Sequence, residues 1–138
     1  MTALDLLCHL FVSTDRDAAG WAFEYPDEEG WESPDCDVMS ARFLTHARQH
    51  GVDGFLVRAE SIDEGQHWFT VITDPDTGAL RAVDWTARQF HNAGHPAPPT
   101  DPYLIECPLI FDWEPEAPTY PLEVVQFQKM VPTEGMPA

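Results

Sequence analysis

Three residues of the kinds that cooperate in thiol-based catalysis follow one another along the chain: Cys36, His67 and Asp84. A thiolate is a strong nucleophile, an imidazole beside it takes up and returns protons, and a carboxylate fixes the orientation and tautomer of that imidazole. This chemistry works only if the three side chains meet in space. Whether Cys36, His67 and Asp84 can form one site therefore depends on the helix and the strands that carry them.

Cys36 lies near the start of the clearest predicted helix, SPDCDVMSARFLTHARQHG, residues 33–51. Ser33 or Asp35 can cap this helix, Pro34 suits its first turn, and Gly51 suits its C-terminal end. We expect its apolar side to consist of Val38, Ala41, Phe43, Leu44 and Ala47. Free N–H groups and the helix dipole favour a thiolate at this end, so the position suits a nucleophile.

His67 and Asp84 lie on two predicted strands, HWFTVI and ALRAVDW, which flank the turn sequence DPDTG. If the loop is residues 75–78, Asp74 faces Ala79. His67 then lies opposite Thr86, and Asp84 is its diagonal neighbour on the same face. A tighter turn sets His67 directly opposite Asp84, whereas a slip of one residue puts the two on opposite faces.

A cysteine at a helix N-terminus, a histidine at the start of a strand (HWFTVI) and an aspartate at the end of the next (VDWT) resemble the papain-like and transglutaminase-like superfamily of cysteine hydrolases and acyltransferases. The segment DWTARQF is similar to segments of small bacterial papain-fold proteins, toxin and effector domains among them. The resemblance covers about residues 31–90. It implies that Cys36 is the nucleophile, with its backbone N–H as an oxyanion donor, that His67 is the general base and acid, and that Asp84 orients His67.

Each of these residues also has a purely structural interpretation. Cys36 can pack as a buried free thiol, and His67 can bond to a backbone carbonyl. Asp84 can cap the turn formed by residues 86–89. The neighbouring Trp68 and Trp85 are expected in the core or a cleft wall.

The sequence offers little support for a metal or a bound cofactor. His91 and His95 have the spacing of metal ligands on a helix, but Asn-Ala-Gly lies between them and Pro96 follows, which disfavours a helix. Paired-cysteine ligands and a glycine-rich phosphate loop are both missing from the sequence. We therefore predict that the site uses neither a metal nor a cofactor.

The remaining patterns predict one α+β domain, in which the Cys36 helix packs on a small antiparallel sheet. Residues 4–12 form either a short helix or a buried strand, 15–35 are expected to be irregular, and 54–61 form a strand. Ten of the thirteen prolines follow Phe90, so residues 91–138 are expected to be a proline-rich extension beyond a core of about 31–90. Two apolar runs within it, YLIECPLIF and LEVVQF, are expected as edge or covering strands.

The chain is strongly acidic, with 24 acidic against 7 basic side chains and a formal net charge of −17. Such a charge repels nucleic acids and anionic membranes, so we predict neither as a partner and expect a protein or peptide substrate, with basic ones favoured. Three separated cysteines indicate reduced thiols, and neither a secretory signal nor a membrane span is recognisable. We expect a cytoplasmic protein, with delivery as an effector left open and the oligomeric state unassigned.

The leading functional hypothesis is a cysteine-dependent amidohydrolase or acyltransferase that works through a thioester. Peptidase, deamidase and transglutaminase chemistry share this intermediate, and the sequence does not choose among them. The alternative is a non-catalytic acidic binding module of papain-like fold that docks a basic partner protein. A third hypothesis is an acidic mimic of nucleic acid.

Overall fold

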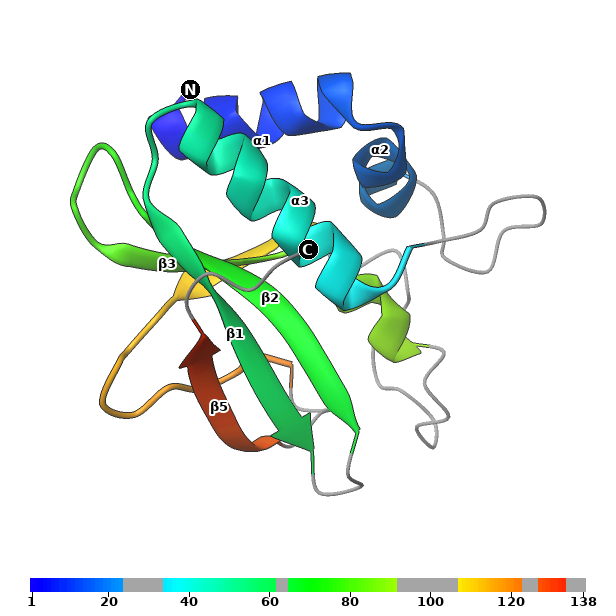
Figure 1. The fold of residues 1–138 in the computed structure, drawn as a ribbon, viewed down its shortest axis with the longest axis vertical. Helices are drawn as coiled ribbons and strands as arrows, with labels where there is room; N and C mark the ends of the chain where they lie inside the picture. Colours follow the sequence, from blue (N-terminus) through cyan, green and yellow to red (C-terminus); the bar gives the residue numbers. More distant parts are fainter. Residues whose placement is uncertain (24–33, 62–64, 92–106, 123–126, 134–138) are drawn as a thin grey trace.

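The structure is a computed structural model that describes residues 1–23, 34–61, 65–91, 107–122 and 127–133. Over these residues it has an α+β fold with three α-helices and a five-stranded antiparallel sheet, which confirms the predicted class at this level (Figure 1). The elements are α1 (Ala3–Thr14), α2 (Arg16–Phe23), α3 (Cys36–Gln49), β1 (Gly54–Ser61), β2 (Gln66–Thr73), β3 (Leu80–Asp84), the 3-10 helix η1 (Ala87–His91), β4 (Leu109–Asp112) and β5 (Phe127–Thr133). The strand order is β4-β3-β2-β1-β5. None of the helices in these residues is long and apolar enough to cross a membrane.

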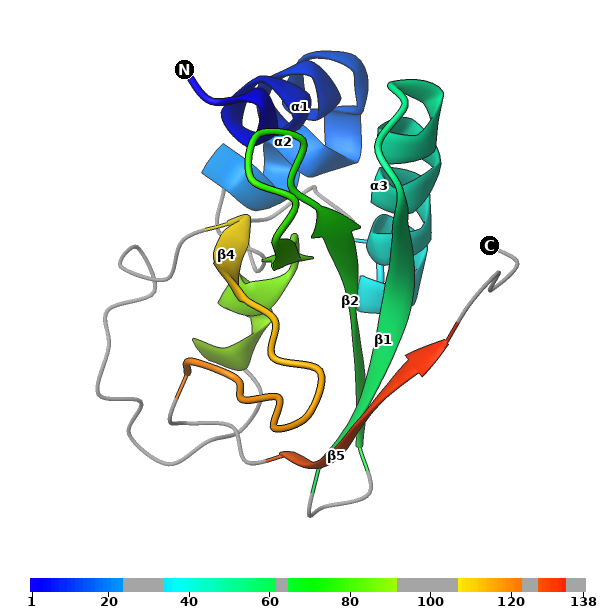
Figure 2. The same cartoon turned by 90° about the vertical axis from the view of Figure 1, so that its left-hand side faces the viewer.

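The sheet is covered on both faces. The three helices lie on one side of it, and the segment that follows β4 runs along the other (Figure 2). The core on the helix side includes Phe11, Met39, Phe43, Ile72, Val83 and Trp85. The core on the opposite side includes Val57, Phe69, Val71, Ala82 and Trp113, with Phe111, Tyr120 and Phe127 packed against it. Neighbouring residues of β2 therefore point into different cores, as strand geometry requires.

Residues 16–23 form helix α2, so the expectation of an irregular segment over 15–35 is wrong for this part. Asp15 ends α1, and its Oδ1 accepts hydrogen bonds from the backbone N–H groups of Asp17 (2.9 Å) and Ala18 (3.1 Å). One carboxylate thus supplies the cap from which the second helix begins. Gly20 disfavours a helix locally, but it is buried there with Trp21, and this packing outweighs propensity. Residues 24–33 lie outside the described part of the chain.

Residues 4–12 belong to α1, which settles the choice between helix and strand.

Helix α3 confirms the predicted Cys36 helix with two corrections. It begins at Cys36 after the N-cap Asp35, whose side chain makes no capping hydrogen bond, so Pro34 precedes the helix instead of lying in its first turn. Val38 is 39% exposed and does not belong to the buried side. The inward stripe follows Met39, Phe43 and Ala47 at four-residue spacing, and Val38 lies just outside it.

The β2–β3 hairpin has the first of the predicted registers. Thr70 pairs with Val83 and Thr73 with Leu80, so Asp74 faces Ala79 across the turn. The turn contains Gly78 at φ +76°, a conformation that glycine adopts without strain. The tighter alternative is thereby excluded, and His67 and Asp84 share one face of the sheet.

The region after residue 91 contributes both outer strands. β4 pairs with β3, and β5 pairs with β1. β4 covers the end of the predicted run YLIECPLIF and is an edge strand as expected, whereas only Phe127 of the predicted run LEVVQF lies in β5 and Leu122 lies in no strand. β5 extends beyond the predicted run to Thr133 and contains Pro132, which an edge strand tolerates because it need not donate on its open side. Residues 103–106 of the first run and residues 123–126 of the second lie outside the described part of the chain.

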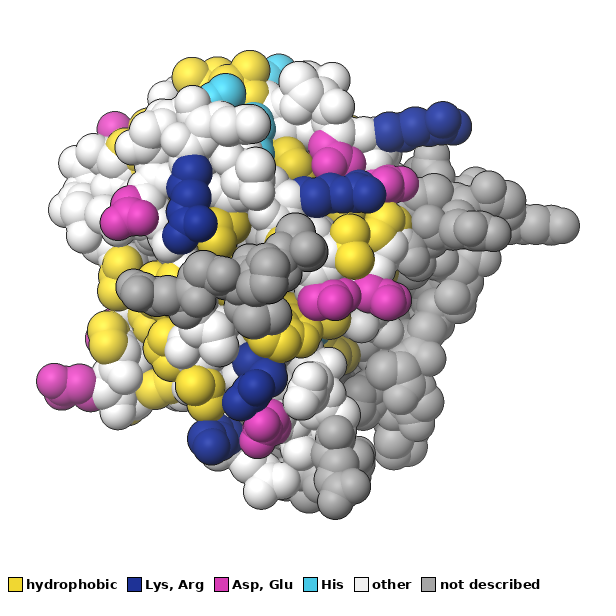
Figure 3. Space-filling model, in the orientation of Figure 1, with side chains coloured by type: hydrophobic (Ala, Val, Ile, Leu, Met, Phe, Trp, Pro, Cys, Tyr) yellow, Lys and Arg dark blue, Asp and Glu magenta, His cyan; other side chains and the backbone are white. Residues whose placement is uncertain are grey.

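The acidic charge of the described residues is partly compensated at short range. Arg42 of α3 pairs with Asp17 at 2.8 Å, and Arg81 pairs with Asp112 at 2.9 Å. On the face drawn in Figure 3, basic and acidic side chains of the coloured residues lie interspersed. That part of the surface therefore does not have the regular acidic array that a nucleic-acid mimic needs.

Candidate active site

His67 and Asp84 meet at the point where the β2–β3 ladder ends. β2 begins at Gln66, but its pairing with β3 starts only at Thr70, so His67 lies beyond the ladder. Its Nε2 lies 2.7 Å from Oδ2 of Asp84, the last residue of β3. An ionised carboxylate has no hydrogen to donate, so Nε2 carries the hydrogen of this bond.

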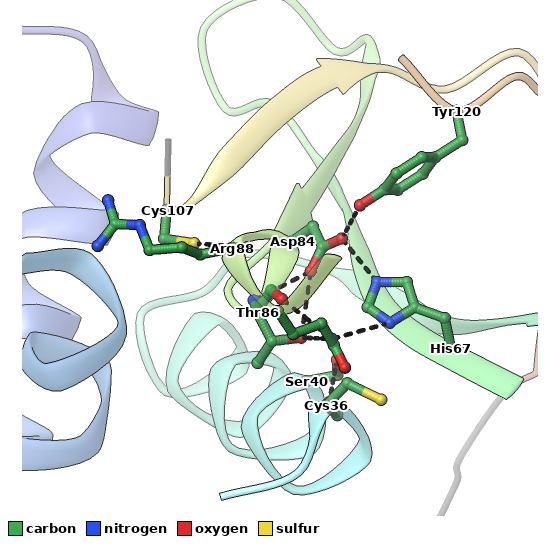
Figure 4. A network of polar contacts seen from close by, with 9 residues as sticks. Cys36, Ser40, His67, Asp84, Thr86, Arg88, Cys107 and Tyr120 are labelled. Atoms are coloured by element: carbon green, nitrogen blue, oxygen red, sulfur yellow. Dashed lines mark hydrogen bonds and ion pairs between the residues drawn. The ribbon is translucent and has the colours of Figure 1, made fainter. Parts of the chain in front are cut away.

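The Asp84 carboxylate is fully buried, with 0% of the residue exposed, and both of its oxygens are used. Oδ1 accepts a hydrogen bond from the backbone N–H of Thr86 at 3.0 Å, and Oδ2 accepts one from the Tyr120 hydroxyl as well as from His67 (Figure 4). Asp84 therefore makes both contacts, because Oδ1 caps the turn formed by residues 86–89 and Oδ2 is bonded to His67.

The second ring nitrogen of His67, Nδ1, faces η1. It lies 3.3 Å from Nε2 of Gln89. That amide nitrogen has two hydrogens, and it donates to the backbone oxygen (3.0 Å) and Oγ1 (2.8 Å) of Thr86. The contact with Nδ1 is consequently not a third donation, and Nδ1 remains available for proton exchange.

The pKa of His67 is raised from 6.5 to about 9. Burial of the ring is the largest single effect and would lower the pKa, but the raising effects of Asp84 and Cys36 together outweigh it, those of Asp84 being the larger. Cys36 adds to the increase through a hydrogen bond and through its charge. Aromatic rings of Phe90 and Phe127 pack against the imidazole, with centroids 4.7 and 6.0 Å away. The ring is therefore an imidazolium at neutral pH although only 2% of the residue is exposed.

Cys36 reaches this pair from the first residue of α3 (Figure 4). Two hydrogen bonds hold the start of the helix in place. Thr70 of β2 donates through Oγ1 to the backbone oxygen of Ser40 at 2.8 Å, and Trp21 of α2 donates through Nε1 to the backbone oxygen of Pro34 at 3.3 Å. The helix start is thereby tied both to the sheet strand that carries His67 and to α2.

The accessibility of the three thiols separates Cys36 from the others. Cys36 is partly exposed, whereas Cys8 and Cys107 are buried. Burial raises the pKa of Cys8 to about 12, and it does the same for Cys107. The interpretation of Cys36 as a buried, packed thiol is therefore not supported, and the two buried cysteines are poor nucleophiles.

The turn that carries Gln89 is braced by Arg88. Its backbone N–H lies 3.3 Å from Sγ of Cys107, and its guanidinium donates to the backbone oxygens of Trp21 (3.1 Å) and Ala22 (3.4 Å). These carbonyls lie at the C-terminal end of α2, where a cation is favoured. Helix α2 thus supports both the Cys36 helix and η1.

The structure brings together all three predicted site residues, shows Thr86 in its expected place in the turn capped by Asp84, and adds two residues that the sequence analysis did not assign to the site: Gln89 and Tyr120. Thr86 and Gln89 belong to DWTARQF, where the short spacing after Asp84 was an available signal. Tyr120 lies 36 residues from Asp84 in the proline-rich region, and no local pattern marks it. Among the described residues, no group of three or more His, Cys, Asp or Glu side chains is arranged so that it could hold a metal ion. His95 lies outside the described part of the chain.

Comparison with known proteins adds no relative to this picture. No protein-family model matches the chain, and neither a curated protein nor a solved structure matches it. The geometry of Cys36, His67 and Asp84 is therefore the basis on which a function can be inferred.

Proposed function

We propose that this protein is a cysteine-dependent amidohydrolase or acyltransferase in which Cys36 is the nucleophile, His67 the general acid and base, and Asp84 the orienting residue. The observation that carries the proposal is the buried His67 ring, bonded to Asp84 at 2.7 Å and hydrogen-bonded to the partly exposed Cys36. A structural histidine has no need of a raised pKa beside an accessible thiol, whereas a catalytic pair does. Membership of the papain-like and transglutaminase-like superfamily is included in this proposal.

The first chemical step follows from the charges of the pair. The Cys36 thiolate attacks the carbonyl carbon of an amide, a C–S bond forms, and the carbonyl electron pair moves onto oxygen. The backbone N–H of Cys36, at the first position of α3, has no partner within the helix and suits the developing oxyanion. Collapse of this intermediate breaks the C–N bond, and His67 gives the Nδ1 proton to the leaving nitrogen.

The second step resolves the thioester. Neutral His67 takes a proton from water or from an amine as that nucleophile attacks the thioester carbon, and the Cys36 thiolate leaves. Water gives hydrolysis or deamidation, and an amine gives acyl transfer. Asp84 keeps Nε2 of His67 protonated throughout, so that Nδ1 alone exchanges protons with substrate and thiol.

Thiol alkylation tests the Cys36–His67 pair without a known substrate. The wild-type protein and His67→Gln are treated with iodoacetamide at about pH 6.5, and the labelled site and rate are read by peptide mass spectrometry. An ordinary thiol of pKa about 8.5 is only about 1% ionised at this pH. We expect a single label, on Cys36, and about 100-fold slower labelling in the variant. Cys8 and Cys107 serve as internal controls, and equal Cys36 rates in the two proteins would overturn the proposal.

Turnover is then sought with glutamine-containing peptides of basic and acidic composition. Release of ammonia, incorporation of a fluorescent primary amine and new peptide N-termini distinguish deamidase, transglutaminase and peptidase activity. Cys36→Ser is expected to abolish the activity found while the protein stays folded with stability close to that of the wild type, and Asp84→Asn is expected to reduce the activity by up to about 10⁴-fold. Full activity of Cys36→Ser would exclude Cys36 as the nucleophile. Slow, His67-independent alkylation with no turnover would favour the acidic binding module.

A further inference from the structure

The Tyr120 hydroxyl donates to the same oxygen of Asp84 that accepts from His67. Both hydrogen bonds end on Oδ2, and the Tyr120 ring lies edge-on to the imidazole with centroids 5.9 Å apart (Figure 4). Tyr120 belongs to the segment between β4 and β5 and is distant in sequence from β2 and β3, which carry His67 and Asp84. Oδ2 of Asp84 therefore accepts hydrogen bonds from a phenol and from an imidazolium at the same time.

This tyrosine is held in place by packing on the far side of the sheet from α3. Its ring lies 5.4 Å from that of Phe111 in β4 and 5.1 Å from that of Phe127 in β5, measured between centroids. The segment starts at the buried Trp113, whose backbone N–H donates to the backbone oxygen of Leu80 at 3.1 Å. The phenol thus has a fixed geometry toward Asp84.

Tyr120 stays protonated over the whole range in which His67 titrates. Burial of the hydroxyl raises the pKa of Tyr120 well above 10, and the negative charge of Asp84 raises it further. The hydroxyl is consequently a donor to Asp84 whether or not His67 carries its proton. Other titratable groups coupled to this cluster are Cys36 of α3, which acts on both rings, and Cys107, which acts on Tyr120.

We propose that Tyr120 is a positioning residue that sets the proton affinity of His67 by sharing Oδ2 of Asp84. A carboxylate oxygen that already accepts one hydrogen bond is a weaker acceptor for the second, so the phenol weakens the hold of Asp84 on the imidazolium. In the proposed reaction, on which this role rests, His67 must release its Nδ1 proton to a leaving group. Tyr120 makes that release easier than an unshared Asp84 would.

The test is the titration of the His67 ring, followed through its ¹⁵N chemical shifts and assigned with His67→Gln. Tyr120→Phe keeps the ring contacts with Phe111 and Phe127 and removes only the hydroxyl. We expect this substitution to raise the pKa of His67 by about 0.5 to 1 unit, because neutral His67 beside an unshared Asp84 anion becomes less favourable. An unchanged or lowered pKa would overturn the proposal.

Phe111→Leu is the matched control, since it disturbs the packing of Tyr120 without removing a bond to Asp84. It should leave the His67 pKa unchanged, and an increase equal to that of Tyr120→Phe would assign the effect to packing and refute the role of the hydroxyl. If Tyr120→Phe does not fold, incorporation of 3-fluorotyrosine gives an isosteric and stronger donor, for which the pKa of His67 must fall. A rise or no change with 3-fluorotyrosine contradicts the proposal.

The titration needs neither substrate nor turnover, which separates the two proposals. If Cys36 proves unreactive but Tyr120→Phe still raises the His67 pKa, the proposed activity fails and the coupling between Tyr120 and His67 stands. If Cys36 shows His67-dependent alkylation but the pKa does not move, the activity stands and the role of Tyr120 fails. When both hold, Tyr120→Phe also moves the alkaline limit of the activity to higher pH, which a purely structural tyrosine would not do.

Discussion

The protonation of His67 should make the stability of this protein fall as the pH rises. Its pKa is about 9 in the folded protein against an ordinary value of 6.5. Between these values the folded protein holds a proton that the unfolded chain has released. The stabilisation is therefore complete below about pH 6.5 and is lost as the pH rises through about 9. At about 1.4 kcal/mol per pKa unit, it amounts to about 3 kcal/mol.

Urea unfolding of the wild-type protein and of His67→Gln, followed by tryptophan fluorescence between pH 6 and pH 10, measures this contribution. Trp85 lies in the core and reports the transition. Packing lost in His67→Gln lowers the unfolding free energy by the same amount at every pH. Loss of the titrating His67 ring, in contrast, changes how the unfolding free energy depends on pH. We expect the difference in unfolding free energy to shrink by about 3 kcal/mol over this range, and to shrink less in a Cys36→Ser background, because Cys36 supports the imidazolium. A difference that is constant with pH would refute the reasoning.

Two further predictions concern the elements that position the site. Thr70→Val removes the hydrogen bond from Thr70 to the Ser40 carbonyl at nearly constant side-chain volume. It should lower the unfolding free energy by about 1 kcal/mol in urea titrations. An unchanged unfolding free energy would mean that this hydrogen bond does not hold the start of α3. Gly54→Ala places a Cβ 2.5 Å from the backbone oxygen of Val71 and should cost about 1–3 kcal/mol, while Gly65→Ala, which meets only a side-chain oxygen at 3.2 Å, should cost clearly less. Equal melting temperatures for the two glycine variants would contradict the close β1–β2 approach.

Much of the secondary structure was predictable because its signals are local. The DPDTG turn and the apolar runs around it gave the correct register of the β2–β3 hairpin, and the breakers around residues 34 and 51 delimited α3 to within a few residues. Helix α2 was missed because Gly20 is an unfavourable local residue whose burial depends on other elements. The same dependence explains Val38, whose exposure follows from the direction in which α3 faces the sheet.

The order of Cys36, His67 and Asp84 could be interpreted from the sequence alone, since a helix start and a hairpin register are local features. The strands place His67 and Asp84 on one face, and the helix start makes Cys36 a candidate nucleophile. The sequence therefore determined which residues to consider and the register that lets two of them meet. Their catalytic roles remain a proposal, to be decided by the alkylation and turnover experiments.

Only the tertiary structure decided the electrostatic state of the site. The pKa of His67 depends on its burial, on the 2.7 Å bond to Asp84 and on the approach of Cys36 from another element. The Tyr120 bond joins residues 36 positions apart through a segment rich in proline and poor in local signals. Burial and interatomic distance arise when distant segments pack together, and the local periodicity, turns and caps of a sequence do not encode them.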